Sequence, residues 1–364
     1  MIFCPGYYLG ILWLSSGFRL FFHIYRVYAY KMVRFTVLAS GSKGNSAVVT
    51  SVSGTGGSTR ILVDAGLSCR ELFRRMRLAG EDPAQLDAIV ITHEHQDHIQ
   101  GLAVTARRLG IPVYCTEATH RAWVRQVTPQ RRISYAEWLA QYKSSGKKSA
   151  QFAGPHPPHP DPEPDPDPAP EPDPVPDPLP MPGQTLEQAT GLANDPARLP
   201  MVNYFRAGER FSIGCVQVDP FTIPHDAADP VGFVFTAEGV RLAVATDLGY
   251  MPPNVKAQLK RCDLILLESN HDLEMLRDGP YPWSVKQRVL SRVGHLSNDA
   301  CAQFFEQDYD GHATYLILGH LSESNNMPEL ARMAAERGLC SQPSLLANRL
   351  HLAMQHEPME TICM

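Results

Sequence analysis

The stretch Thr92-His93-Glu94-His95-Gln96-Asp97-His98 decides how this chain is interpreted. It follows an apolar run that predicts a buried strand. At a strand end alternate side chains point the same way, so His93 and His95 can coordinate one ion together. Asp97 and His98 come after the chain turns and can serve a second ion. Imidazole and carboxylate groups suit zinc, and also manganese or iron, so the stretch predicts a metal site.

Packing is a poor explanation of these four side chains. Buried neutral histidines usually occur singly. Three histidines and one aspartate within so short a stretch would leave costly unpaired polar groups in a core. We therefore expect the cluster to be functional.

The rest of the chain alternates between strand-like and helix-like segments. Apolar and β-branched runs predict strands at residues 33–38, 47–51, 60–64, 88–92, 111–115, 211–213, 216–218, 231–235, 242–245, 264–267 and 315–318. Amphipathic patterns predict helices at residues 69–79 (with Ser68 as N-cap), 101–109, 283–293, 297–307 and 327–337. This order suits two mixed sheets covered by helices.

Residues 1–31 are expected to lie outside the fold. Segment 7–22 is apolar but is broken by Arg19, and it is short for a membrane span. No small-residue cleavage site follows it, so a secretory signal fits poorly. Met32 stands directly before the first predicted strand, and we expect the natural start there. The alternative is a membrane-associated helix, although we expect no stable membrane association.

A Pro-rich insert is expected to divide one domain into two halves. Residues 144–199 are built on Asp-Pro and Glu-Pro repeats, in which a Pro at every second position excludes helix and sheet. We expect a disordered loop there, with no ligand role for His156 or His159. The first half of the domain would then be residues 32–143, and the second half residues 200–355.

Charge and cysteine usage set only broad limits. The formal net charge is −5, but seven acids and no Lys or Arg fall between residues 155 and 182, and without them it would be +2. Composition therefore argues neither for nor against a polyanionic substrate, because local patches decide that question. The eight cysteines are scattered singly without a C-x-x-C pair, as in a reducing compartment. We expect a cytoplasmic protein.

The histidine stretch resembles the H-x-H-x-D-H signature of the metallo-β-lactamase superfamily. The resemblance covers nearly the whole chain from Met32, except the insert. It implies an α/β (α+β) fold with four layers, αββα, in which helices sandwich two mixed sheets. Asp64, in Val63-Asp64-Ala65-Gly66, matches the early aspartate of the superfamily, which orients the metal-binding loop.

Three later motifs match further metal ligands of the superfamily. They are Ile223-Pro224-His225-Asp226, Ala245-Thr246-Asp247-Leu248-Gly249 and Leu318-Gly319-His320-Leu321-Ser322. Taken singly, each could be a turn or a surface residue. The resemblance implies two sets of ligands: His93, His95 and His225 for one ion, and Asp97, His98 and His320 for the other, with Asp247 as the bridge.

A narrower resemblance points to the YycJ/WalJ branch, which is similar to tRNA 3′-processing endonucleases of the same fold. It is carried by residues 38–46, 225–232, 268–272 and 294–298. Members of this branch are described as nucleases acting on DNA. The resemblance implies that His295 assists proton transfer to the leaving oxygen and that Glu268 supports it.

These resemblances imply a metal-dependent hydrolase, in particular a phosphodiesterase or nuclease acting on DNA. Two divalent ions, zinc or alternatively manganese, held about 3.5–4 Å apart can clamp the attacking and leaving oxygens of a phosphodiester. A metal-activated hydroxide would be the nucleophile, with Asp97 orienting it and His295 protonating the departing oxygen. The partner would be nucleic acid, DNA favoured, and DNA repair the expected role.

Other functions use the same residues. Thioester or lactam hydrolysis could occur at the same metal site, although the Glu268 and His295 motifs favour phosphodiesters. A non-catalytic, metal-stabilised interaction protein is disfavoured by the intact ligand set, and an O₂-reducing di-iron enzyme by His95, where a carboxylate is needed. Candidates for phosphate contacts are Arg74, Arg75, Arg107, Arg108, Arg131 and Arg132, although solvated helix faces are the commoner explanation.

Overall fold

The computed structural model describes residues 32–54, 57–128, 195–340 and 349–364. The extension 1–31 and residues 144–194 of the insert lie outside the described residues. The expectations about them, including those for His156 and His159, therefore stay predictions. No helix within the described ranges is long and apolar enough to cross a membrane.

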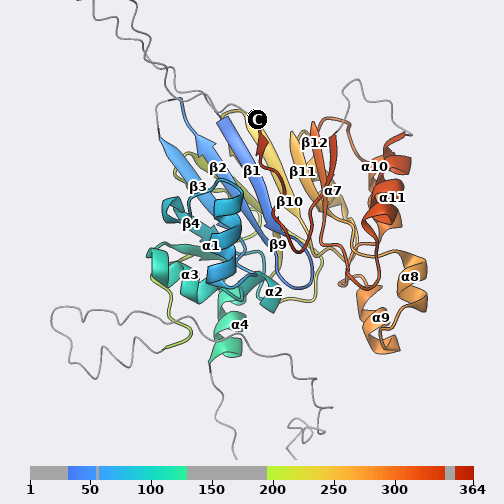
Figure 1. Ribbon diagram of the computed structural model, residues 1–364, viewed down its shortest axis with the longest axis horizontal. Coiled ribbons are helices and arrows are strands. Elements are labelled where there is room, and N and C mark those ends of the chain that lie inside the picture. Colours follow the sequence, from blue (N-terminus) through green and yellow to red (C-terminus); the bar gives the residue numbers. More distant parts are fainter. Residues whose placement is uncertain (1–31, 55–56, 129–194, 341–348) are drawn as a thin grey trace, which may run out of the picture.

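The strands of these ranges form two seven-stranded sheets (Figure 1). The first has the order β14-β1-β2-β3-β4-β5-β6 and consists of β1 (Met32–Ala39), β2 (Ser46–Val52), β3 (Ser58–Val63), β4 (Ala88–Val90), β5 (Val113–Cys115), β6 (Val202–Tyr204) and β14 (Ile362–Cys363). The second has the order β13-β12-β11-β10-β9-β8-β7 and consists of β7 (Phe211–Ile213), β8 (Val216–Thr222), β9 (Val231–Ala237), β10 (Val240–Ala245), β11 (Leu264–Glu268), β12 (Tyr315–Gly319) and β13 (Arg349–Leu352). Both are mixed, with parallel pairing from β3 to β6 and from β10 to β13.

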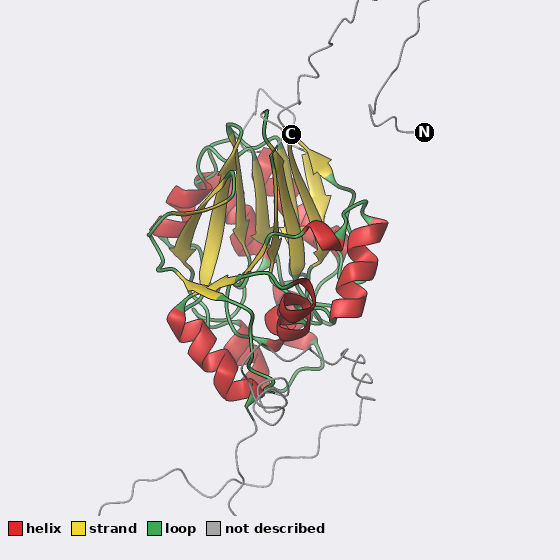
Figure 2. Cartoon of the chain, turned by 90° about the vertical axis from the view of Figure 1, so that its left-hand side faces the viewer, coloured by secondary structure: helices red, strands yellow, loops and turns green. Residues whose placement is uncertain are grey.

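Helices cover the outer face of each sheet (Figures 1 and 2). The first sheet is covered by α1 (Cys69–Leu78), α3 (Leu102–Leu109) and α4 (Glu117–Val127), and the second by α7 (Pro253–Leu259), α10 (Asn298–Gln307) and α11 (Pro328–Cys340). At the strand ends lie α2 (Gln96–Ile99), α8 (Leu273–Asp278) and α9 (Trp283–Val289), while η1 (Pro83–Gln85) is a single turn before β4. The predicted four-layer αββα arrangement is therefore confirmed.

Alternation of side chains along the strands builds three apolar layers. Ile61 and Val63 of β3 pack into the core between the two sheets, whereas Leu62 packs against the helices outside the first sheet. Successive side chains of a strand point to opposite faces, and both faces are covered here. That is why the central strands are almost continuously apolar in the sequence.

The predicted site residues follow strand ends at one edge of the molecule. They are Asp64 after β3, His93 after β4, His225 after β8, Asp247 after β10, Glu268 at the end of β11 and His320 after β12. Because β8 and β10 are each antiparallel to β9, they run in the same direction. The carboxyl ends of parallel strands meet at one edge of each sheet, so these side chains are brought together there.

Several elements differ from the sequence-based expectation. Helices α4, α7 and α8 and strands β6, β13 and β14 were not predicted, and α9 ends at Val289 rather than at residue 293. Strand β14 lies beyond residue 355, where we expected the second half to end, and pairs with β1. Strand β6 follows the insert but completes the first sheet beside β5.

A glycine lets the loop after β3 lie against the histidine stretch. Ala65 N donates to His98 O (2.8 Å), and Asn45 N donates to Asp97 O (2.7 Å). A Cβ on Gly66 would lie only 1.7 Å from Asp97 O, so no larger residue fits without backbone movement.

We expect Gly66→Ala to lower the free energy of unfolding by about 1–3 kcal/mol, because the methyl group must displace backbone rather than a flexible side chain. Urea denaturation of the chelator-treated chain measures this. Gly57→Ala is the matched control: its Cβ would meet no atom closer than 3.6 Å, so its effect should stay within about 0.5 kcal/mol. Equal effects of the two substitutions would contradict the expectation.

Candidate active site

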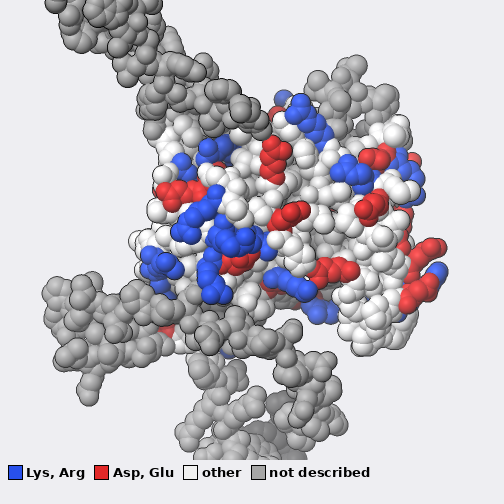
Figure 3. All heavy atoms as spheres, viewed as in Figure 1, with Lys and Arg blue, Asp and Glu red and all other residues white. Residues whose placement is uncertain are grey.

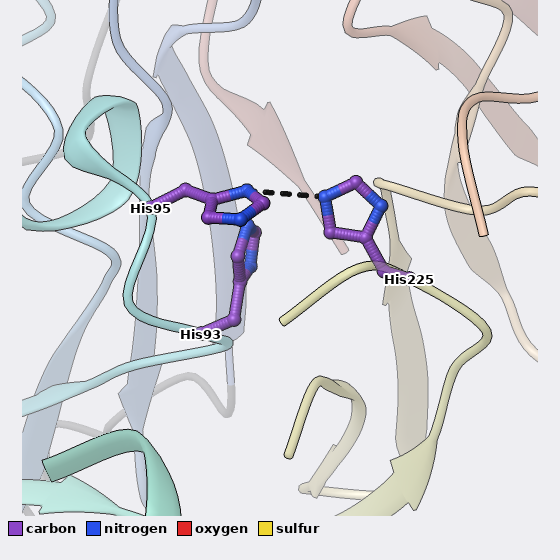
Figure 4. Close-up of side chains that lie close together, drawn as sticks. All are labelled: His93, His95 and His225. Carbon is purple, nitrogen blue, oxygen red and sulfur yellow. Dashed lines mark hydrogen bonds between the residues drawn. The ribbon is translucent and has the colours of Figure 1, made fainter. Parts of the chain in front are cut away.

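Three histidines from both sheets meet at this edge (Figure 4). His93 and His95 follow β4 of the first sheet, and His225 follows β8 of the second. One ring nitrogen of each lies within 4.8 Å of the others. The structure thus brings together the three residues that the resemblance assigned to one ion.

Hydrogen bonds fix which nitrogen of each ring faces the centre. The outer nitrogens donate as follows: His93 Nδ1 to Thr92 Oγ1 (3.0 Å), His225 Nδ1 to Gly294 O (3.1 Å), and His95 Nε2 to Asp226 O (3.2 Å). The inner nitrogens then carry lone pairs. Nε2 of His93 is buried and has no hydrogen-bond partner among the described residues. Nδ1 of His95 faces Nε2 of His225 at 3.2 Å, an arrangement that needs a cation or an added proton between them.

Carboxylates dominate the other half of the site. The distances that define it are His98 Nε2 to Asp97 Oδ2 (3.4 Å) and to Asp247 Oδ2 (3.4 Å), His320 Nε2 to Asp97 Oδ2 (3.8 Å), and His320 Nδ1 to Asp247 Oδ1 (3.0 Å) and to Glu268 Oε1 (3.4 Å). Asp247 Oδ2 is buried without a hydrogen-bond partner within the described ranges. The four residues assigned to the second ion and to the bridge therefore lie together, and Glu268 lies beside them.

The two halves of the site differ in their electrostatics. Burial lowers the pKa of His93 well below its ordinary value and also lowers that of His225, so these rings stay neutral, as metal ligands must. Burial would also lower the pKa of His98, but Asp247 and other carboxylates raise it well above normal. Burial opposes protonation of His320 as well, but the carboxylates of Asp247, Glu268 and Asp97 raise its pKa to about 9. The carboxylate half therefore requires positive charge.

These observations fit divalent metal ions. Buried lone pairs converge in one half and buried carboxylates require cations in the other, and both features are what coordinated metal ions satisfy. Three sets of side chains have ligand atoms within 4.8 Å of one another: His93, His95 and His225; His93, His98 and Asp247; and Asp247, Glu268, His295 and His320. The site residues are therefore arranged for metal binding.

Asp64 connects the histidine stretch to the first sheet. Its Oδ1 accepts a hydrogen bond from Thr92 N (2.8 Å), and its Oδ2 accepts from Thr92 Oγ1 (2.9 Å) and His98 Nδ1 (2.8 Å). The bond to Nδ1 turns Nε2 of His98 toward Asp97 and Asp247. Burial raises the pKa of Asp64, opposed by its contacts with His98 and Thr92. Its carboxylate thus contacts the side of the His98 ring that faces away from Asp97 and Asp247. This position fits the orienting role that the resemblance implies.

Three site residues have a left-handed backbone. The φ angles are 59° at Asp64, 62° at Asp247 and 54° at His320. Such φ values are uncommon outside glycine and persist only where surrounding contacts hold them. At His320 the backbone N donates to Ser40 Oγ (2.7 Å) and the backbone O accepts from Asn270 Nδ2 (2.8 Å).

His295 and Glu268 form a hydrogen-bonded pair beside the metal ligands. His295 Nδ1 donates to Glu268 Oε1 (2.8 Å). Glu268 is fully buried, and its Oε2 accepts from the backbone N of Leu248 and from that of Leu296 (3.3 Å). Because Nδ1 is engaged, Nε2 is the nitrogen of His295 that is left for a substrate, and the ring is 22% exposed.

Sequence reasoning assigned no role to two residues that contact these ligands. Asn45 Nδ2 donates to Asp97 Oδ2 (3.0 Å), and Asp226 Oδ1 lies 3.4 Å from His225 Nε2. Both stand inside the motifs that carry the YycJ/WalJ resemblance. Their position within those motifs was the only sign in the sequence that they contribute to the site, because the contacts of their side chains form only in the folded chain.

The described arginine candidates have structural partners. Arg75 is buried and donates to the carbonyls of Leu38 and Gln355, Arg74 pairs with Glu71 (2.7 Å), Arg107 donates to Asp195 O, and the guanidinium of Arg108 lies over the ring of Phe73. Arg131 and Arg132 lie outside the described residues. Basic side chains gather over α1 in Figure 3, but the partners of these arginines favour the structural explanation.

A cavity of about 680 Å³ lies between α4 and the loop after His225. Its lining includes Arg121, Arg125, Tyr204 and Arg206, together with the acids Glu117, Glu209 and Asp229. Arg121 pairs with Glu117 (2.6 Å), and the cavity as a whole is balanced in charge. His271 is buried with both ring nitrogens unpartnered in the described structure, and burial lowers its pKa to about 4.

Comparison with known families agrees with this geometry. The sequence matches the metallo-beta-lactamase superfamily over residues 40–282. The chain therefore belongs to the metallo-β-lactamase superfamily.

Within it, the chain is similar to two named bacterial enzymes. It is 33% identical over 310 residues to exodeoxyribonuclease YycJ of Bacillus anthracis, covering 84% of this chain and 89% of that protein. It is 29% identical over 300 residues to exodeoxyribonuclease WalJ of Streptococcus pneumoniae, covering 82% and 86%. The resemblance to the YycJ/WalJ branch is thereby confirmed.

Solved structures share the fold. YhfI of Bacillus subtilis, a metallo-beta-lactamase fold protein, is 13% identical with a TM-score of 0.50, covering 91% of this chain and 99% of that one. Zn²⁺-bound PqqB from Methylobacterium extorquens is 15% identical with a TM-score of 0.52, covering 90% and 99%.

We expect Asp64→Asn to weaken zinc binding about 10- to 100-fold, because the amide would present a donor to a group that already donates to Asp64 and would misorient His98. Competition with a chromogenic zinc chelator measures the affinity. Asp87→Asn is the matched control, since Asp87 is exposed and accepts a hydrogen bond from Arg60 N (2.7 Å) far from the histidines. Unchanged zinc affinity in Asp64→Asn would argue against the orienting role.

Proposed function

We propose that this protein is a metal-dependent nuclease that hydrolyses phosphodiester bonds in DNA. The observation that carries the proposal is the His295–Glu268 pair, which stands directly beside the converging metal ligands. A phosphodiester needs a proton for its departing oxygen, and a positioned imidazole can supply one near neutral pH. The names of the YycJ and WalJ relatives, both exodeoxyribonucleases, support DNA as the substrate.

We propose the same ligand sets for two ions as the resemblance implies. His93, His95 and His225 would hold one ion, Asp97, His98 and His320 the other, and Asp247 would touch both. The histidine-rich donor set favours zinc, with manganese as the alternative. When bound, such ions supply a nucleophile from water at neutral pH and stabilise negative charge on the phosphate.

The protein's own groups divide the remaining work. Glu268 holds Nδ1 of His295, so that Nε2 can present a proton to the leaving oxygen. Asp97 is held by Asn45 and lies beside His98 and His320, where it can orient the attacking water. Burial of Glu268 and Asp247 keeps both carboxylates in fixed positions, which limits reorganisation during the reaction.

We also propose a cytoplasmic location and a role in DNA repair. The seven cysteines of the described ranges are all free, which supports a reducing, cytoplasmic environment. DNA repair stays a prediction that rests on the relatives' activity. Thioester and lactam hydrolysis remain the alternatives for the same site.

Substrate class is tested with the chain from Met32 loaded with zinc or manganese. We expect cleavage of DNA, measured with labelled duplex DNA, single-stranded DNA and RNA beside a chromogenic lactam and a thioester. Asp97→Ala is the control and should be inactive on every substrate. Robust lactam or thioester turnover without phosphodiester cleavage under either metal would overturn the nuclease proposal.

The proton-donating role of His295 is tested with leaving groups of different basicity. We expect His295→Gln to slow DNA cleavage about 10²- to 10⁴-fold, but to slow hydrolysis of bis(p-nitrophenyl) phosphate far less, since p-nitrophenolate departs without a proton. Comparing kcat on the two substrates measures the difference. His312→Gln is the matched control, because His312 is exposed and lies next to Asp263. Equal slowing of both substrates would indicate a structural role for His295.

A further inference from the structure

Helix α9 is the least buried helix of the site. None of its residues is buried, and Trp283 at its start is 66% exposed. Five of the eleven large apolar side chains exposed in the described structure fall in one short segment: Leu273, Trp283, Val285, Leu290 and Val293. In Figure 3 the surface at the lower right, around α9, is mostly free of charged side chains, whereas α8 beside it carries Glu274, Arg277 and Asp278. An apolar patch of this kind on a surface usually marks a binding site.

The segment is physically part of the active-site wall. His295 N donates to Val289 O (3.0 Å), and Asp226 N donates to Val293 O (3.1 Å). His225 donates through Nδ1 to Gly294 O, and Arg288 donates to the carboxylate of Asp226. The end of α9 and the residues that follow it are therefore bonded directly to His225, Asp226 and His295.

The charges of this segment favour a polyanion. Lys286, Arg288 and Arg292 fall between residues 279 and 298, where there is no Asp or Glu. Lys286 donates to the carbonyls of Arg277 and Gly279, and Arg288 is paired with Asp226. Arg292 is exposed, stacks on Tyr250 at 4.3 Å, and has no acidic partner among the described residues, so its charge is available to a ligand.

We propose that the α9 surface, formed by Trp283, Leu290, Arg292 and Val293, binds the nucleic-acid strand that flanks the scissile bond. This inference rests on the proposed nuclease function. Trp283 stacks on a base, and Arg292 contacts a backbone phosphate. Aromatic side chains that stack on bases, combined with cations that contact the backbone, are the means by which proteins hold single strands without reading sequence.

A second copy of this chain fits the surface less well. A two-fold interface places the same patch of each subunit against itself. Here that would bring Arg292 of one copy toward Arg292 of the other, and neither segment 279–298 contains an acid to pair with it. A phosphate of a nucleic acid pairs with Arg292 instead, while Lys286 and Arg288 keep their partners within the chain.

The test compares a strand with a substrate too small to reach α9. We expect Trp283→Ala to raise the KM for a single-stranded 20-nucleotide DNA roughly 5- to 100-fold, while kcat/KM for bis(p-nitrophenyl) phosphate stays unchanged. Trp283→Phe should retain most of the affinity. Arg292→Gln should reduce the slope of log affinity against log salt by about 0.7, the value for one lost phosphate contact on a single strand. Leu78→Ala, at a 64% exposed residue of α1, is the control and should match the wild type.

The other outcomes overturn the inference in distinguishable ways. Loss of activity on both substrates would mean that Trp283 only supports the wall around His295. An unchanged KM for DNA, or a changed mass by sedimentation without a change in KM, would assign the surface to another partner or to a second copy. Absence of any phosphodiester cleavage by the wild type would remove the proposed function and this inference with it.

Discussion

The carboxylate of Asp64 accepts three hydrogen bonds from the histidine stretch, and most of the site depends on them. Two come from Thr92, whose hydroxyl in turn accepts from His93, and one comes from His98. A single buried side chain thus sets the ring orientation in both halves of the site. Its left-handed backbone, which places the carboxylate there, is held by the bonds from Asp64 N to Val90 O (2.9 Å) and from Ser46 Oγ to Asp64 O (2.6 Å).

The same constraint explains why the two sheets must pack closely. His93 belongs to the first sheet and His225 and Asp247 to the second, so the ligand sets close only when the strand ends of both sheets meet. The core between the sheets, which includes Phe35 of the first sheet and Phe233 of the second, fixes that distance. Burial of apolar surface therefore brings together carboxylates and imidazoles that would otherwise be costly to bury, and metal ions can compensate this cost.

The sequence predicted the fold well, and the structure brings the predicted ligand residues close together, because both rest on local patterns or ordered motifs. His93 to His98 form one stretch, and Asp64, Asp247 and His320 directly follow apolar strand runs. His225 follows β8, in which Gln217 and Asp219 interrupt the apolar pattern. Helix α4 was missed because only Thr119 and Trp123 are buried, which leaves little apolar periodicity. No role was predicted for Asn45 or Asp226. Each contacts a residue that is distant in the chain, and the sequence does not reveal such a contact.

The candidate metal ligands are buried and held in place, whereas the α9 surface beside them is exposed. The groups that would hold metal ions lie at the ends of buried strands. Hydrogen bonds from their other polar atoms to the protein restrict their side-chain orientation. Helix α9 buries none of its residues, yet through Val289, Val293 and Gly294 its segment is bonded to His295, Asp226 and His225. Binding on that surface and positioning of the reacting groups are therefore linked through a few hydrogen bonds to the backbone of this segment.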